Sequence, residues 1–203
     1  MDIEIAHRRS WPGRPMTLMS CTRLLLSSPE LRLLLIHRIV HWLHEKRKAS
    51  NRYQWFWLAL LILIEPTKWA TQVCAKSIIC TSCEIEGGVY FSDQGHIVFG
   101  AQKTGAGTVI GPRVTVGINL TDRGTPAIGR SVWIGSDCVI YGSISIGDGA
   151  TLLPGTVLTR SIPAGVVMQG NPAQLVLRNF DNTELRALYD VDAMQHVAIK
   201  RRV

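Results

Sequence analysis

The sequence predicts a mainly β protein: a solenoid of stacked six-residue repeats, preceded by an α-helical segment and followed by a short C-terminal helix. Three observations predict it. Nine of the eleven residues at every sixth position from Val98 to Leu158 are aliphatic, glycine follows many of them, and the chain before about residue 75 has a helical period instead. Neither a helix nor an ordinary alternating strand gives a period of six, so each repeat is expected to form one short strand and one turn.

Two helices are expected ahead of the repeats. Ser28, Pro29 and Glu30 provide a capping hydroxyl, a proline at the first helical position and an acid in the first turn. An apolar stripe at helical spacing then includes Leu31, Leu34, Leu35, Arg38, Ile39, Trp42 and Leu43. A second helix is expected over about 53–74, kinked or broken at Pro66.

The repeat itself can be followed residue by residue. Its recurring positions are Val98, Thr104, Ile110, Val116, Asp122, Ile128, Ile134, Ile140, Ile146, Leu152 and Leu158. The glycines that follow permit the unusual dihedral angles of the turns. Because one repeat cannot bury its own apolar face, stability is expected to come from stacking of successive repeats.

No metal site is expected. His37, His41 and His44 share one helical face, but no carboxylate or cysteine is suitably spaced beside them, which favours a half-buried polar edge. Cys80 and Cys83 form a single C-x-x-C with no second ligand pair. The five scattered cysteines argue against a disulfide framework and fit a reducing compartment, so a cytoplasmic location is expected.

The repeats "VIGPRV", "AIGRSV", "WIGSDC" and "SIGDGA" resemble those of the hexapeptide-repeat acyltransferases. That resemblance implies a left-handed parallel β-helix of triangular cross-section, a homotrimer, and between three and four coils over residues 98–163. Within the class, "GGVYFSDQGHIVFGA", "VTVGINLTDRGTPAIG" and "SIPAGVVMQGNPAQLV" are most similar to serine acetyltransferases and their relatives in exopolysaccharide gene sets. The implied activity is acetyl transfer from acetyl-CoA, a cosubstrate rather than a tightly bound cofactor.

The chain departs from the family at its catalytic positions. Without gaps, Asp93 stands where serine acetyltransferases carry their catalytic histidine, and Thr125 stands where they carry the second one. His96 is the one histidine between residues 45 and 195, so it is the candidate base, oriented by Asp93. The alternative for His96 is structural: two residues before Val98, it would point inward and be buried.

Further site residues follow from the same resemblance. The acceptor-binding candidates are Gln94, Asn119, Asp122 and Thr125, and the coenzyme-binding candidates are Gly117, Gly135, Ser136 and Gly142. Arg113, Arg123, Arg130 and Arg160 are candidates for pairing with phosphates. The glycines have a second explanation, because every coil needs glycine for folding.

The expected organisation is a helical segment at 1–80, the β-helix at 81–177, and a helix with a basic tail at 178–203. The net charge of +7 favours anionic partners, but no basic stripe with interleaved aromatics indicates nucleic acid. Residues 53–69 either touch the inner face of the membrane or pack on the coils or trimer mates. Three functions stay open: an O-acetyltransferase whose acceptor is a polysaccharide sugar, a true serine acetyltransferase, and an inactive coenzyme-binding scaffold.

Overall fold

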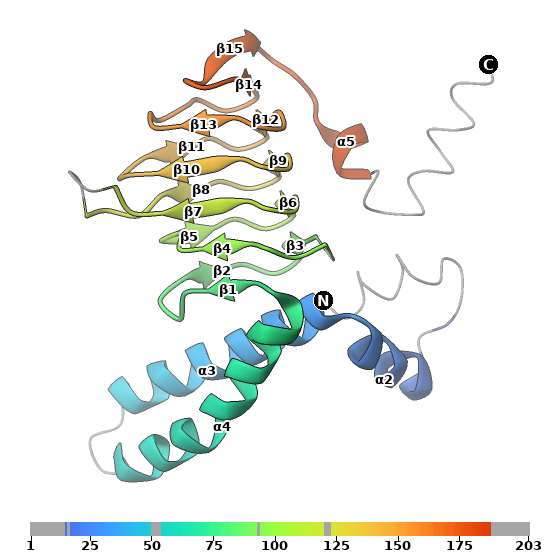
Figure 1. The fold of residues 1–203 in the computed structure, drawn as a ribbon, viewed down its shortest axis with the longest axis vertical. Helices are drawn as coiled ribbons and strands as arrows, with labels where there is room; N and C mark the ends of the chain where they lie inside the picture. Colours follow the sequence, from blue (N-terminus) through green and yellow to red (C-terminus); the bar gives the residue numbers. More distant parts are fainter. Residues whose placement is uncertain (1–14, 16, 50–53, 93, 120–122, 188–203) are drawn as a thin grey trace.

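The computed structural model describes residues 15, 17–49, 54–92, 94–119 and 123–187. Its centre is a parallel β-helix, in which the chain winds through three sheets in turn (Figure 1). The first sheet contains β1 (Ile78–Ile79), β4 (Val98–Phe99), β7 (Thr115–Gly117), β10 (Val139–Tyr141) and β13 (Val157–Leu158). The second contains β2 (Glu84–Ile85), β5 (Lys103–Thr104), β8 (Ala127–Ile128) and β11 (Ser145–Ile146). The third contains β3 (Tyr90–Phe91), β6 (Val109–Ile110), β9 (Trp133–Ile134), β12 (Thr151–Leu152) and β14 (Val167–Gln169), closed by antiparallel β15 (Gln174–Leu177).

The predicted six-residue frame holds from Thr104 to Val116 and from Ile128 to Leu158, and its position at Asp122 lies outside the described residues. Side chains at its positions form vertical columns inside the prism, and they are buried because the turns hold each strand in register with the coil below. One column, for example, pairs Ile110 with Ile134 and Ile134 with Leu152. The coils between residues 98 and 163 number three complete sets of strands plus β13 and a bridge at Ile162, as the resemblance implies.

The frame is wrong at Val98, which is 47% exposed, while Ile97 and Phe99 point into the core. The register shifts by one residue because Thr104 follows the inward-pointing Phe99 by five residues, whereas Ile146 follows Ile140 by six in a higher coil. One further coil, β1 to β3, lies below the predicted repeats.

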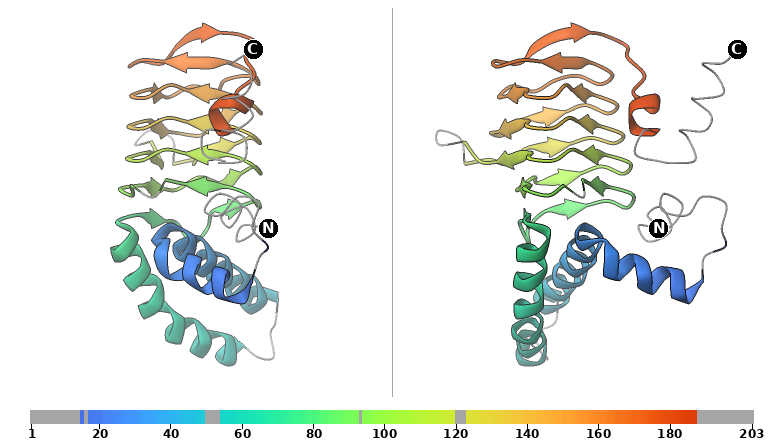
Figure 2. Two further views of the ribbon diagram at one scale, coloured as in Figure 1. Left: turned by 90° about the vertical axis from the view of Figure 1, so that its right-hand side faces the viewer. Right: turned by 45° about the vertical axis from the view of Figure 1, so that its right-hand side comes forward.

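The helices lie at the bottom of the β-helix, where α2 extends to one side from the start of α3 and α3 packs on α4 (Figure 2). Their bounds are α2 Leu18–Ser27, α3 Pro29–Ala49 and α4 Gln54–Ala75. A capping box between Thr17 and Ser20 starts α2, which periodicity alone did not reveal. α3 begins where predicted, but α4 continues through Pro66 rather than breaking there.

The buried face of α3 is turned slightly from the predicted stripe. His37 and Val40 are buried, whereas Ile39 and Trp42 are about half exposed. The helix turns this way because it packs on the lowest coil: the His37 Nε2–H donates to the Cys83 carbonyl over 3.1 Å. Burial lowers the pKa of His37 to about 4.

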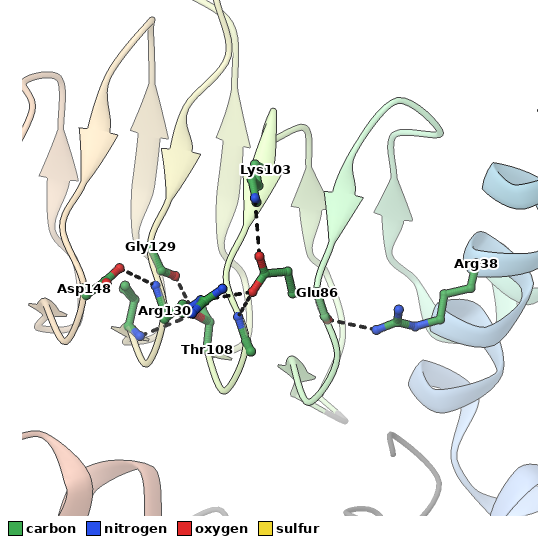
Figure 3. Close-up of polar contacts among 9 residues, drawn as sticks. Arg38, Glu86, Lys103, Thr108, Gly129, Arg130 and Asp148 are labelled. Atoms are coloured by element: carbon green, nitrogen blue, oxygen red, sulfur yellow. Dashed lines mark hydrogen bonds and ion pairs between the residues drawn. The ribbon is translucent and has the colours of Figure 1, made fainter. Parts of the chain in front are cut away.

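Glu86 joins that lowest coil to the coils above and to α3 (Figure 3). Its carboxylate accepts hydrogen bonds from Ala106 N at 3.1 Å and Arg130 Nε at 3.3 Å, and it pairs with Lys103 at 3.3 Å. The bond from Ala106 N lowers the pKa of Glu86. Its backbone carbonyl accepts a 2.9 Å bond from Arg38 of α3. The helices are therefore attached to two corners of the lowest coil, at the turn that contains Cys83 and at Glu86.

The C-terminal segment returns along the prism. α5 (Thr183–Ala187) starts one residue after the predicted Asn182, and the rest of the predicted helix lies outside the described residues. The Asn182 Nδ2 donates to the carbonyls of Ser131, Gly149 and Ala150 at 2.8, 3.1 and 3.3 Å. One buried amide thus fastens the segment to two successive coils.

Candidate active site

The predicted site residues fall at two different corners of the prism. The loop corner, residues 117–126 together with Gly142, joins the first sheet to the second. The His96 corner, residues 94–97, 111–113, 135–137 and 153–155, joins the third sheet to the first. The two corners lie at opposite ends of the strands of the first sheet, so one chain alone does not bring His96 beside Asn119.

The loop corner contains the one enlarged turn along its edge. After β4 and β10 the turns are residues 100–102 and 142–144, but after β7 the turn is 118–126. The described ends of this loop run outward from the coils (Figure 2). Asn119 and Thr125 are half-buried at its two ends, and Asp122 lies outside the described residues.

Three of the predicted residues meet at the loop corner. Gly142 N donates to the Gly117 carbonyl over 3.2 Å. The Asn119 Cβ lies 3.8 Å from where a β-carbon on Gly142 would stand. Amide and backbone groups of two successive coils are thereby placed next to each other.

The His96 corner is a stack of tight turns. His96 N donates to the Lys76 carbonyl at 2.9 Å, and Arg113 N donates to the Gly95 carbonyl at 3.2 Å. One coil higher, Gly155 N donates to the Ser136 carbonyl at 2.9 Å. His96, Arg113 and Asp137 all have positive φ, between 55° and 61°. The backbone of His96 is thus fixed as part of this stack.

The side chain of His96 is exposed, which contradicts the buried, inward orientation of its structural interpretation. The physical reason is the one-residue register shift between Phe99 and Thr104, which puts Ile97 rather than His96 at the inward position of this turn. No hydrogen bond to the imidazole is found among the described residues. Gln94 beside it is also exposed, and Asp93 lies outside the described residues.

The three candidate glycines differ in why the fold needs them. A β-carbon on Gly135 would lie 2.8 Å from Pro154 N of the next coil, and Gly142 has a φ of 102°. Both therefore have folding reasons to be glycine. Gly117 has neither constraint, since nothing lies within 4 Å of its missing β-carbon. A glycine without a folding reason marks a place where a ligand can approach the backbone.

Two of the four candidate arginines are already held by carboxylates. Arg113 makes a bidentate pair with Asp137, both contacts at 2.6 Å, and Arg130 bonds to Glu86. Arg160 instead lines a groove of about 250 Å³ between β13 and β15, together with Arg178. Sequence reasoning missed Arg178, because only the antiparallel turn of β15 over β14 brings it to Arg160.

The histidines of α3 and the cysteines of the lowest coil make other contacts. His41 Nδ1–H donates to the Thr81 carbonyl over 3.3 Å, so it shares the role of His37. Cys83 is buried beside the Phe99 carbonyl, and burial raises the pKa of its thiol to about 12. Across the part of the chain that the structure describes, no three His, Cys, Asp or Glu side chains are grouped to hold a metal.

The sequence of the upper coils is similar to known transferases. Residues 125–160 match the family "Bacterial transferase hexapeptide (six repeats)". The chain is 32% identical over 68 residues to a chloramphenicol acetyltransferase of Agrobacterium fabrum, covering 34% of this chain and 32% of that protein. It is 41% identical over 49 residues to the galactoside O-acetyltransferase of Escherichia coli, covering 24% of each. The chain thus spans about a third or less of these curated relatives.

Solved structures share the fold over most of the chain. A serine acetyltransferase from Vibrio cholerae superposes with a TM-score of 0.70 at 23% identity, covering 95% of this chain and 68% of that one. A serine acetyltransferase from Brucella abortus, solved in complex with coenzyme A, gives 0.61 at 17% identity and covers 87% and 67%. The chain thus has the left-handed β-helix fold of these serine acetyltransferases, its residues 125–160 match a hexapeptide-repeat transferase family, and the two curated proteins compared above are acetyltransferases.

Proposed function

We propose that the protein is an O-acetyltransferase that moves the acetyl group of acetyl-CoA to a hydroxyl acceptor. The observation that carries the proposal is the division of the candidate residues between two corners of the first sheet. In a homotrimer with threefold symmetry, the His96 corner of one subunit faces the loop corner of the next. Each interface then contains a base from one chain and an enlarged loop from its neighbour.

The chemistry follows from those groups. The His96 imidazole accepts the proton of the acceptor hydroxyl while its oxygen attacks the thioester carbonyl carbon. The tetrahedral oxyanion receives hydrogen bonds from the Asn119 amide and the backbone near Gly117. Collapse breaks the carbon–sulfur bond, and the coenzyme A thiolate takes the proton back from the imidazolium. Asp93 orients the base, while Gln94, Asp122 and Thr125 contact the acceptor.

Acetyl-CoA lies along the interface from the loop corner towards the top of the prism. The pantetheine arm approaches the backbone most closely at Gly117. Gly135, Ser136 and Gly142 contribute main-chain groups that bind it. Arg160 and Arg178 bind phosphate in the groove below β15, since no carboxylate among the described residues occupies them. The Brucella abortus serine acetyltransferase of similar fold, solved in complex with coenzyme A, supports this choice of cosubstrate.

The acceptor is a sugar hydroxyl, with L-serine as the second candidate. Asp93 and Thr125 occupy the positions of both family histidines, which separates this chain from serine acetyltransferases in the acceptor site. A relative named for galactoside acetylation supports the sugar. We place the reaction in the cytoplasm, because all five cysteines are free.

The decisive experiment is subunit complementation with mass-spectrometric detection of acetylated product. His96→Ala and Asn119→Ala are each expected to be inactive as trimers, assayed with acetyl-CoA against L-serine and a panel of galactosides. Trimers reassembled from an equal mixture regain about a quarter of wild-type activity, since one interface in four has both intact corners. No recovery would place both residues in one subunit's site. A wild-type trimer that binds acetyl-CoA without any turnover would favour the inactive scaffold.

A further inference from the structure

The outer face of α4 is apolar along its whole length. Trp55, Ile62 and Trp69 are seven positions apart, about two helical turns, so they and their exposed neighbours lie on one face of the helix. The large ones are Trp55, Phe56, Ile62, Leu63, Trp69 and Val73, between 56% and 83% exposed. A helix on the surface of a globular protein normally presents polar residues to solvent, so a continuous apolar face of this size marks an interaction surface.

This face is distinct from the one that packs within the chain. Leu61 of α4 is buried against Val40 and Leu43 of α3, and Trp57 and Ile64 pack on the same cluster. The two charged residues of α4 leave the outer face mostly apolar. Glu65 is 51% exposed at its border, three residues after Ile62 and four before Trp69, and it pairs with Lys68 over 3.7 Å. The Lys68 ammonium is turned away and bonds to Thr81 of the lowest coil over 2.7 Å. The side chain of Lys68 is only 16% exposed.

Cations and aromatic rings gather at one end of this face. α3 and α4 form an antiparallel hairpin, so the last turn of α3 and the first turn of α4 lie at the same end (Figure 1). Lys46, Arg47 and Lys48 are exposed there. The Lys46 ammonium lies 5.6 Å from the ring centre of Trp42, whose ring meets Trp57 edge to face at 5.9 Å.

Charge decides which partner this surface fits. Two copies joined through the hairpin end would bring two cationic triplets together, and only Lys48 is offset, by Glu45 at 2.9 Å. Anionic lipid headgroups attract such a triplet, while Trp side chains favour the boundary between headgroups and acyl chains. No helix in the described ranges has the length and apolarity to cross a bilayer. A surface-lying helix uses one apolar face instead.

We propose that the outer face of α4, with the cations at the end of α3, docks the protein on an anionic lipid surface. The 22-residue helix lies in the plane of the membrane with Trp55 and Trp69 inserted near its two ends. The β-helix then stands away from the lipid on the other side of α3. The proposal does not depend on the acetyl transfer, because none of the residues that carry it belongs to the candidate active site.

Vesicle flotation of the full chain tests it. The probes are vesicles of phosphatidylcholine alone and of phosphatidylcholine with a third phosphatidylglycerol. Wild type is expected to bind the anionic vesicles at least tenfold more tightly, and less so as salt increases. The double variant Trp55→Ser/Trp69→Ser is expected to lose at least tenfold in binding, as is Lys46→Gln/Arg47→Gln. Both keep the fold, since these side chains are exposed.

The matched control is Val176→Ser/Leu177→Ser, which removes exposed apolar side chains from β15 at the opposite end of the molecule. It is expected to bind like wild type. Equal binding by the tryptophan variant overturns the proposal, as does absence of binding to either vesicle. If wild type ignores vesicles and the tryptophan variant forms a smaller oligomer in light scattering, the face is instead an interface between copies of this chain.

Discussion

Replacing His96 with glycine tests separately what this residue contributes to the stability of the fold and what it contributes to acetyl transfer. His96 has a φ of 61°, an exposed side chain, and no hydrogen bond to its ring among the described residues. The left-handed conformation costs a residue with a β-carbon about 1–2 kcal/mol. Glycine escapes that cost, but it gives the unfolded chain extra freedom worth roughly 0.5–1 kcal/mol. The net expectation is a gain of about 0.5–1 kcal/mol.

For a chain of this size, such a gain raises Tm by roughly 1–4 °C. The same variant is expected to lose acetyl transfer, because glycine has no base. Ser131→Gly is the matched control: its φ is 55°, but it lies at the third corner, away from both halves of the site. It should gain similar stability and keep full activity. Differential scanning calorimetry and product detection by mass measure both effects.

Two outcomes would refute this reasoning. A fall in Tm of more than about 2 °C for His96→Gly, with the control unaffected, would mean that the imidazole stabilises the fold. Turnover by His96→Gly at the wild-type rate would remove His96 from the mechanism. Because the two readouts are independent, the structural and catalytic interpretations are tested separately.

Three further predictions concern other parts of the molecule. Gly117→Ala should fold normally yet bind coenzyme A at least tenfold more weakly, which ligand titration measures. Gly135→Ala should instead lose about 1–3 kcal/mol of stability, measured by calorimetry, because its β-carbon clashes with the next coil. Because burial lowers the pKa of His37 to about 4, its contribution to the free energy of unfolding is fully present above pH 6.5. That contribution is lost as the pH falls towards 4, by up to about 3 kcal/mol. His37→Gln should therefore make the urea midpoint less dependent on pH over that range. Asn182→Asp, which cannot donate to three carbonyls, should cost about 1–3 kcal/mol and speed proteolysis after β15.

The sequence predicted the repeats well and the first coil poorly, for a physical reason. Between Thr104 and Leu158 the coils keep the six-residue step except at the inserted loop, so the aliphatic columns can be read directly. The lowest coil also steps by six, from Ile79 to Ile85 to Phe91, but it is out of phase with that frame, because Phe99 comes eight residues after Phe91 and Thr104 five after Phe99. The six-residue pattern therefore identifies only the coils from Thr104 upward, although the parallel pairing of strands continues from them into the lowest coil.

The site was predicted in part, and the missing part is spatial. The loop residues Asn119 and Thr125 could be found from the interruption of the repeat, and the structure places Asn119 beside Gly142. The separation of His96 from that loop could not be found, because it depends on which corner each turn occupies. The sequence also could not show that Arg160 and Arg178 line the same groove, because β15 reverses direction after the repeats end.

The fold itself limits where acceptor specificity can lie. The positions inside the prism are apolar or small and tightly stacked, so a change there costs stability before it changes chemistry. The corners behave differently: one left-handed turn position in the stack is filled by His96, Arg113, Asp137 and Gly155 in successive coils. Such a position accepts many side chains without disturbing the core. Residues 94–96 and 118–126 are therefore where this chain can differ in acceptor from proteins of the same fold. Exchanging 118–126 for a relative's loop should change the acceptor while leaving Tm within a few degrees.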